Sequence, residues 1–183
     1  MPGVERKRLE RLEAESGHAT SLVRYAPDSR FRSHTHTGGE EFIVLHGVFS
    51  DDSGDFGPLT YVRNQVGSAH APFSEGGCTI FVKLHQMSAS ESPQVTVEFR
   101  DDQEARTLYK DDAEHVQLRS LRADCSIEFV GVEILVLSGT VIASGALAGE
   151  FAAPSWIRVP TSAPVELRAT ESTLLWTKSG HLP

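Results

Sequence analysis

Short runs of β-branched and aromatic residues recur along the chain, separated by clusters of Gly, Pro, Asp and Ser. This alternation predicts many short β-strands joined by turns, which is typical of a β-sandwich or a jelly roll. The runs that we expect to form strands are Glu41–Leu45, Thr60–Arg63, Thr79–Leu84, Val95–Phe99, Glu133–Leu137 and Leu174–Thr177. The segment Glu5–Glu15 has a helical composition in an ambiguous register, and we favour a strand there, as for His115–Leu121.

The strand pattern occurs twice in the chain. Glu41–Gly47 matches Glu133–Gly139 at an offset of 92 residues, and three later segments match at an offset of 95. The later pairs are Gly54–Phe56 with Gly149–Phe151, Thr60–Arg63 with Ser155–Arg158 and Phe81–Lys83 with Trp176–Lys178. A constant spacing with one three-residue insertion is what tandem domains leave in a sequence. We therefore predict two domains, 1–90 and 91–183, with a boundary near Ser88–Pro93, where the β pattern breaks.

The composition argues against several classes of protein. A chain of 183 residues with 39% hydrophobic and 23% charged residues is typical of a soluble globular protein. The formal net charge of −8 argues against a nucleic-acid partner, because phosphate contacts need clustered Lys and Arg. No apolar run approaches the roughly 18–20 residues that cross a bilayer, and no apolar segment follows the basic N-terminus as in a secretory signal. We expect a cytoplasmic protein without a membrane partner, in which Cys78 and Cys125 are buried thiols and do not form a disulfide.

One stretch of the first repeat carries the residue types of a metal site. His34 and His36 are two residues apart, so on a strand they point to the same face. Gly38 and Gly39 allow a sharp turn that brings Glu40 back toward them, and His70 would arrive from a separate strand. Three imidazoles and a carboxylate suit one divalent ion, such as zinc, iron(II), manganese, nickel or copper. The ligand set does not choose among these metals, and a fully occupied zinc site could also be purely structural.

The second repeat serves as an internal control on this site. At the offset of 92, His34, His36 and Glu40 fall on Ser126, Glu128 and Val132, and at the offset of 95 His70 falls on Val165. All four candidate ligands therefore differ in the second copy, while the strand residues keep their character. We predict one metal site, in the first repeat, and a structural or ligand-shaping role for the second.

Other polar residues of the first repeat are weaker candidates for chemistry. Glu41 follows the candidate ligand Glu40, and strand alternation turns it to the opposite face. Three more residues of the first repeat have similar counterparts in the second repeat, which lacks the candidate ligands. Their presence there favours a role in strand packing or in ion pairs between strands over a role in catalysis. They are Tyr61, Arg63 and Lys83, which recur as Trp156, Arg158 and Lys178.

The residues around the candidate ligands resemble the cupin superfamily. The first cupin motif, G-x5-H-x-H-x3-4-E-x6-G, is matched from His34 to Gly47, with Asp28 in place of its opening Gly. The second motif, G-x5-P-x-G-x2-H-x3-N, is matched at Gly67 and His70. The chain departs from it at three flanking positions, Leu59, Gln65 and Ser74. The resemblance implies an all-β tandem cupin, or bicupin, with jelly-roll barrels: a metal-binding cupin over 1–90 and a degenerate one over 91–183.

Within the cupins, the chain is more similar to the ChrR type. The stretches that carry this resemblance are Ser21–Pro27, His34–Glu41, Gly47–Asp51, Tyr61–Asn64, Ala71–Ser74 and Gly77–Leu84. The closing segment Trp176–Leu182 is similar to the end of two-cupin members of the group. The namesake is a zinc-binding anti-sigma factor of the photooxidative-stress response. The resemblance implies one divalent metal held by His34, His36, Glu40 and His70, with zinc as the first expectation and iron, manganese or nickel as alternatives.

The resemblance also implies two functions of different classes. The first is a sensing or regulatory module that responds to a small molecule or to oxidative stress. The second is an iron-dependent dioxygenase that cleaves a diketone or a hydroxylated ketone, as some cupins do, so whether the chain is an enzyme stays open. The namesake's N-terminal sigma-binding domain is not part of the resemblance, so we do not expect this chain alone to bind a sigma factor. Many cupins form homodimers, although an internal duplication can satisfy the same pairing within one chain.

Overall fold

The computed structural model describes residues 3–11, 17–87, 93–99 and 104–182. The chain divides into two compact units, Met1–Phe99 and Arg100–Pro183, here called unit 1 and unit 2. Among the described residues, all regular structure is β except for a 3-10 helix, η1 (Gly145–Leu147), so the expected all-β fold is confirmed. Most of the expected domain boundary at Ser88–Pro93 lies outside the described residues.

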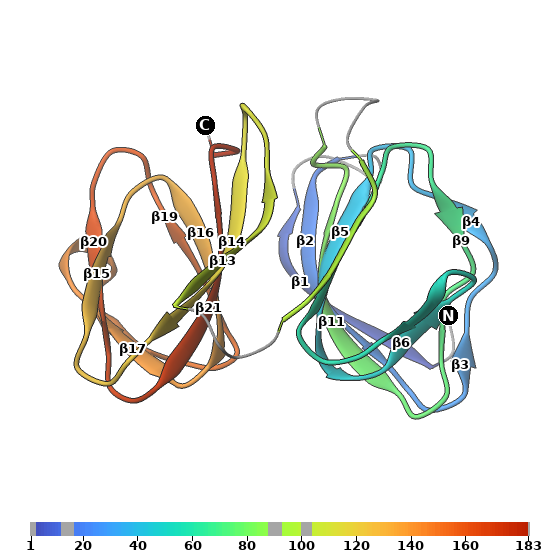
Figure 1. Ribbon diagram of the computed structural model, residues 1–183, viewed down its shortest axis with the longest axis horizontal. Helices are drawn as coiled ribbons and strands as arrows, with labels where there is room; N and C mark the ends of the chain where they lie inside the picture. Colours follow the sequence, from blue (N-terminus) through green and yellow to red (C-terminus); the bar gives the residue numbers. More distant parts are fainter. Residues whose placement is uncertain (1–2, 12–16, 88–92, 100–103, 183) are drawn as a thin grey trace. The chain divides into compact units, whose positions relative to one another are not determined.

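Unit 1 contains a large antiparallel sheet and two smaller ones (Figure 1). The large sheet has the order β1 (Val4–Arg11), β2 (Ala19–Tyr25), β11 (Cys78–Leu84), β5 (Glu40–Gly47), β8 (Thr60–Asn64), β12 (Val95–Glu98). The second sheet has the order β3 (Ser29–Arg30), β10 (Phe73–Ser74), β6 (Phe49–Asp51), β7 (Gly54–Phe56). The third pairs β4 (His34–Thr35) with β9 (Ala69–His70). Because β4 follows β3 and β9 precedes β10 along the chain, this short pair extends the second sheet.

Unit 2 repeats the strand order of unit 1. Its large sheet has the order β13 (Ala105–Lys110), β14 (His115–Leu121), β21 (Thr173–Ser179), β16 (Val132–Ser138), β19 (Ser155–Val159). Its second sheet has the order β15 (Ser126–Phe129), β20 (Val165–Ala169), β17 (Thr140–Ala143), β18 (Gly149–Ala152). Each of these strands has a counterpart in unit 1, so the repeat seen in the sequence is also a repeat of topology.

The strands form where the sequence pattern predicts them. The six expected strands appear as β5, β8, β11, β12, β16 and β21. The segment Glu5–Glu15 contains β1 as far as Arg11, and residues 12–16 lie outside the described part. His115–Leu121 is β14, so the preference for a strand over a helix is confirmed there and in the described part of the first segment, Glu5–Arg11.

Alternation along the strands builds one hydrophobic core in each unit. In unit 1, Phe42 and Val44 of β5 face inward with Val62, Ile80 and Val82 from neighbouring strands. Residues between them face the other side of the sheet. There the Glu41 carboxylate accepts hydrogen bonds from the Tyr61 hydroxyl at 2.7 Å and from Arg63 at 3.2 Å. This agrees with the interpretation that Glu41 is not a ligand and that Tyr61 and Arg63 serve the sheet.

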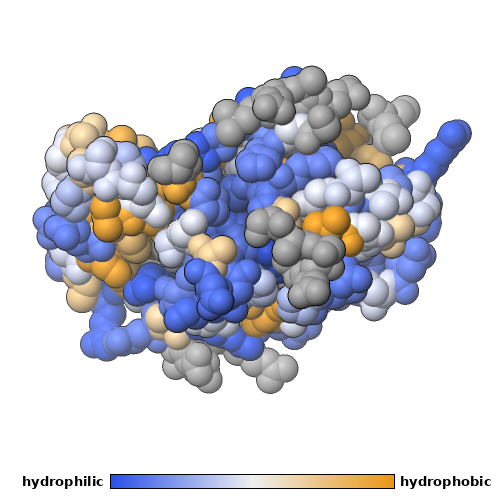
Figure 2. Space-filling model, turned by 90° about the horizontal axis from the view of Figure 1, so that it is seen from above, coloured by the Kyte–Doolittle hydropathy of each residue, from blue (hydrophilic) through white to orange (hydrophobic). Residues whose placement is uncertain are grey.

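The surface agrees with the acidic, polar composition. Hydrophilic residues dominate the face shown in Figure 2, with hydrophobic ones in scattered groups. Among the described residues, the exposed large hydrophobic side chains are Val48 and Val130. The described part of the chain contains no helix with the length and apolar character that a membrane crossing needs.

Candidate metal centre

The four candidate ligands meet at the short sheet of unit 1. His34 on β4 lies directly opposite His70 on β9 in the antiparallel register. His36 follows two residues after His34, and Glu40 is the first residue of β5. The structure therefore brings together side chains from two segments that are about thirty residues apart, as the sequence motif suggests.

A glycine turn delivers Glu40 to the histidines. Gly39 has a positive φ of 74°, a conformation that glycine adopts without steric cost. A Cβ at Gly39 would lie 2.3 Å from the sulfur of Met87, and one at Gly38 would lie 2.6 Å from Nδ1 of His85. The backbone N–H of His85 also donates to the carbonyl of Gly39 at 3.1 Å. The segment that follows β11 therefore packs directly on the turn, and larger residues at these two positions would displace it.

The ligand atoms lie at distances that suit a shared ion. Nε2 of His36 is 2.9 Å from Nε2 of His70. The Glu40 carboxylate is 3.4 Å from the first of these nitrogens and 3.6 Å from the second. Ligand atoms of His34, His36 and His70 all lie within 4.8 Å of one another. Two atoms bonded to one ion at about 2.0–2.1 Å lie roughly 2.8–3.4 Å apart at octahedral or tetrahedral angles. The spacing of His36, His70 and Glu40 is therefore close to that of one shared divalent ion, and His34 lies beside them.

A second layer of hydrogen bonds orients the ligands. Nδ1 of His70 donates to the Asp51 carboxylate at 2.8 Å, which directs the lone pair of Nε2 toward the cluster. The Asn64 side-chain amide donates to Glu40 at 3.0 Å, and Nδ1 of His34 donates to the carbonyl of Arg32 at 3.2 Å. Such partners fix the tautomer and the direction of a metal-binding imidazole.

Burial sets the protonation of these groups. Burial, together with the neighbouring histidines, lowers the pKa of His36 to about 3, so its imidazole is neutral, as a metal ligand must be. Burial raises the pKa of Glu40, although His70 and Asn64 partly offset it. Burial would raise the pKa of Asp51, but hydrogen bonds from His70 and Ser53 outweigh it and the pKa is lowered. Burial would lower the pKa of His70, but the bond to Asp51 outweighs it and the pKa is raised.

The donor set is chemically suited to a cation. The Glu40 carboxylate is 6% exposed, and its nearest basic neighbours are imidazoles. A carboxylate buried this deeply is stable only with a compensating charge or a full set of hydrogen bonds. A divalent ion among the imidazoles would supply that charge. The residues present therefore fit a metal, and neutral imidazole with carboxylate suits zinc or another transition ion.

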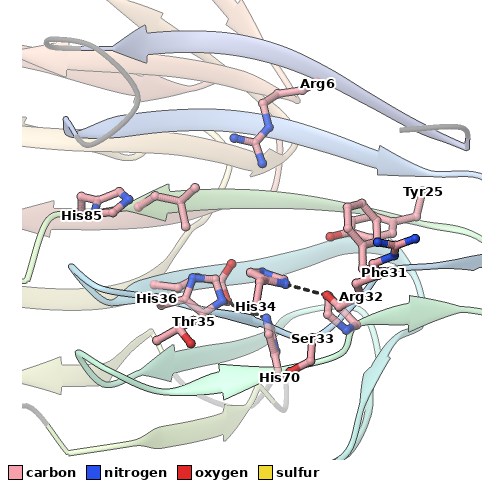
Figure 3. Close-up of a pocket in the computed structure, with 13 residues that line it drawn as sticks. Arg6, Tyr25, Phe31, Arg32, Ser33, His34, Thr35, His36, His70 and His85 are labelled. Atoms are coloured by element: carbon pink, nitrogen blue, oxygen red, sulfur yellow. Dashed lines mark hydrogen bonds and ion pairs between the residues drawn. The ribbon is translucent and has the colours of Figure 1, made fainter.

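The cluster forms one side of a pocket of about 430 Å³ (Figure 3). His34, His36, His70 and Glu40 all line this pocket. Its apolar lining comes from Tyr25, Phe31, Pro72 and Leu84, and Arg6, Arg32 and His85 also border it. His34 is exposed, whereas the other three candidate ligands are buried. The cluster is therefore accessible to a small molecule.

The same place in unit 2 is apolar. Phe129 faces Val165 across β15 and β20, as His34 faces His70 in unit 1. Val132, the counterpart of Glu40, belongs to the same buried core as Phe129 and Val165. The absence of all four ligands from unit 2 therefore holds in the structure.

The strand register corrects two of the sequence equivalences. Offset alone aligns His34 with Ser126 and His36 with Glu128, but the strand pairing puts His34 in the place of Phe129. Glu40 lies six positions after His34, whereas Val132 lies three positions after Phe129. The turn of unit 2 is thus three residues shorter, and His36 has no counterpart there. The sequence offset failed because this change of length falls inside the motif itself.

Sequence reasoning missed two residues of the site, Asp51 and Asn64. The signal that could have found them is the repeat, since Asp51 corresponds to Ala143 and Asn64 to Val159. Both supporting residues are replaced by apolar ones in unit 2, as the ligands are. A comparison of every polar residue of the first repeat with its counterpart in the second repeat would have identified both residues.

Comparisons with known proteins agree with this picture. Residues 1–88 match the family described as ChrR Cupin-like domain. No curated protein sequence gives a significant match to the chain. The matched residues include all four candidate ligands and make up just under half of the chain.

Several solved structures share the fold over nearly the whole chain. AerE from Microcystis aeruginosa is 15% identical, with a TM-score of 0.69 over 97% of this chain and 92% of that one. The bacterial pirin YhhW from Escherichia coli, solved with nickel(II), is 14% identical, with a TM-score of 0.73 over 100% and 94%. A salicylate 1,2-dioxygenase from Pseudaminobacter salicylatoxidans is 11% identical, with a TM-score of 0.69 over 96% and 76%. At these identities the likeness shows the fold alone.

Proposed function

We propose that this chain is a metal-binding, ChrR-like regulatory module that responds to a small molecule or to oxidative stress through the centre in unit 1. The observation that carries the proposal is the convergence of three imidazoles and one buried carboxylate on a single pocket. Unit 2, with apolar residues at those positions, is assigned the role of a degenerate cupin that supports or shapes the first.

The proposed ligands are His34, His36, Glu40 and His70, oriented by Asp51 and Asn64. We assign zinc first, because the resemblance of the sequence to the ChrR type implies it, with iron, manganese and nickel as alternatives. Likeness to a pirin solved with nickel(II) supports a transition metal without selecting one. Zinc supplies Lewis acidity and structural order but no redox chemistry, whereas iron(II) supports chemistry with O2.

A metal-dependent dioxygenase is the second candidate. The pocket favours it over a purely structural metal site. A purely structural zinc site is closed by its own ligands, but here His34 is exposed and the cluster borders a pocket of about 430 Å³. A pocket of this size accommodates a small organic substrate beside the ligands. The fold is also that of a salicylate 1,2-dioxygenase, which makes such chemistry compatible with the scaffold.

Metal analysis of the full chain, purified without added metal, separates the two candidates. The regulatory module is expected to retain one zinc ion per chain and to consume no O2 with acetylacetone, a simple β-diketone probe. Stoichiometric iron together with acetylacetone-dependent O2 uptake, followed with an oxygen electrode, would overturn the regulatory proposal in favour of the dioxygenase. A protein that takes up none of zinc, iron, manganese or nickel would overturn both.

A further inference from the structure

Two guanidinium groups border the metal pocket. Arg6 comes from β1, and Arg32 lies between β3 and β4. In Figure 3, Arg6 extends from β1 toward the histidines, and Arg32 lies beside Phe31 and Tyr25. Both side chains are exposed, and in the described part of the structure neither forms an ion pair with a carboxylate. Their charges are therefore available to a ligand.

The charge of the pocket is opposite to that of the chain. Of the described residues that line it, Glu40 is the one carboxylate, and it is directed to the metal cluster. Arg6 and Arg32 contribute two positive charges, and a divalent ion would add two more. The chain as a whole has a formal net charge of −8. A locally positive pocket in an acidic protein concentrates small anions and disfavours cations.

Part of the remaining lining of the pocket is apolar, beside Ser33, Thr35 and His85. Tyr25 and Phe31 lie with ring centroids 5.2 Å apart, and Pro72 and Leu84 complete this part of the lining. Such surface stabilises an apolar ligand body by excluding water from it. A bare inorganic anion would leave this surface exposed, and an uncharged apolar ligand would leave the two guanidinium groups without a partner.

From these contacts we propose that the pocket binds a small organic anion, a carboxylate or an enolate with an apolar body. Arg6 and Arg32 recognise its charge, and Tyr25, Phe31, Pro72 and Leu84 contact its body. Arg is suited to this task because its planar fork can donate two parallel hydrogen bonds to a carboxylate. The inference rests on the proposed metal centre and names the class of molecule to which that centre responds.

The test compares two ligands of the same shape and different charge. Zinc-loaded full chain is titrated with benzoate and with benzamide by calorimetry. Benzoate is expected to bind at least ~10-fold more tightly, because hydrogen bonds to charged groups are stronger than neutral ones. Raising the salt concentration should weaken the binding of benzoate and leave benzamide nearly unchanged. Inorganic phosphate, which has no apolar body, should compete poorly.

Variants assign the effect to the two arginines. Arg6→Gln and Arg32→Gln are each expected to weaken benzoate binding by about 10-fold, and the double variant by more. Lys7→Gln is the matched control, since it removes the same charge from β1 at an exposed residue that does not line the pocket. Benzoate affinity should not change in that control.

Several outcomes would overturn the inference. They are equal affinity for benzoate and benzamide, no saturable binding of benzoate, undiminished binding in the double variant, or phosphate that competes as well as benzoate. Metal content is measured on every variant, so loss of zinc is not mistaken for loss of the arginines. If the wild-type chain holds no metal, the proposed function fails, and the same pair of titrations on the metal-free protein still decides the role of Arg6 and Arg32.

Discussion

The two units carry the same strand order but place residues of opposite polarity at the same position. In unit 1 the residues that face each other at the pocket are His34 and His70, and in unit 2 they are Phe129 and Val165. Burying an apolar side chain of this size stabilises a fold by about 1.5–3 kcal/mol. Unit 1 forgoes that stabilisation and instead places polar groups there, of which the buried ones, such as His70 and Glu40, are stable only when they are paired. At this place unit 2 therefore extends its apolar core, whereas unit 1 brings polar groups together beside a pocket.

The contrast extends beyond the ligands. Asp51 and Asn64, which orient His70 and Glu40, correspond to Ala143 and Val159 in unit 2. Polar groups in such a network depend on one another, because each is costly to bury without its partner. The network is therefore present as a whole in one unit, and its counterparts in the other unit are apolar. Substitutions in the two units test this contrast.

The largest effect is expected from removing one ligand of unit 1. His36→Ala and His70→Ala should each abolish stoichiometric metal, because three remaining ligands hold the ion weakly and leave Glu40 buried without its partner. Elemental analysis of the dialysed protein measures the metal, and thermal unfolding should show a lower Tm for both variants. His115→Ala in unit 2 serves as the control and should leave the metal content unchanged. One ion per chain in both ligand variants would refute the assignment.

A smaller effect is expected from placing a ligand type in the apolar unit. Val165→His puts an imidazole where unit 2 has no equivalent of His36, Glu40 or Asp51 to pair with it. Burying an unpaired polar group should destabilise the protein by about 1–3 kcal/mol in denaturant unfolding. Val165→Leu controls for the change of size. A gain of a second metal ion, or no loss of stability, would mean that the two units differ less than their cores suggest.

The smallest effect is expected from the supporting carboxylate. Asp51→Asn keeps the size of the side chain and removes the charge that orients His70. Loss of such a partner typically weakens metal affinity by about 10- to 100-fold without abolishing binding. Competition with a metal-binding dye measures the change, and Asp55→Asn, which leaves the cluster untouched, is the control. An unchanged affinity would show that the hydrogen bond between Asp51 and His70 does not support the site.

Much of the fold could be predicted from the sequence, because it depends on local patterns. Two motifs, around His34–Glu40 and Gly67–His70, predicted which four candidate ligands would lie together. Alternation marks the strands, and the His34–Glu40 motif keeps its ligands within seven residues. The supporting residues could not be found in this way, since Asp51 meets His70 only through the pairing of distant strands. Arg6 was missed for the same reason: it reaches the pocket from β1, far from the motif in the chain.

The length of one turn has a consequence for how such a chain can change over generations. The turn before β5 is three residues longer in unit 1, and those residues include the position of His36. A single in-frame loss of nine nucleotides there would remove one ligand and leave the strands on both sides in register. The other polar residues of the cluster would then lower the stability of the fold without contributing to metal binding. Replacement of each by an apolar residue would therefore be favoured. The scaffold can in this way pass from a metal centre to a plain core by one deletion followed by ordinary point mutations.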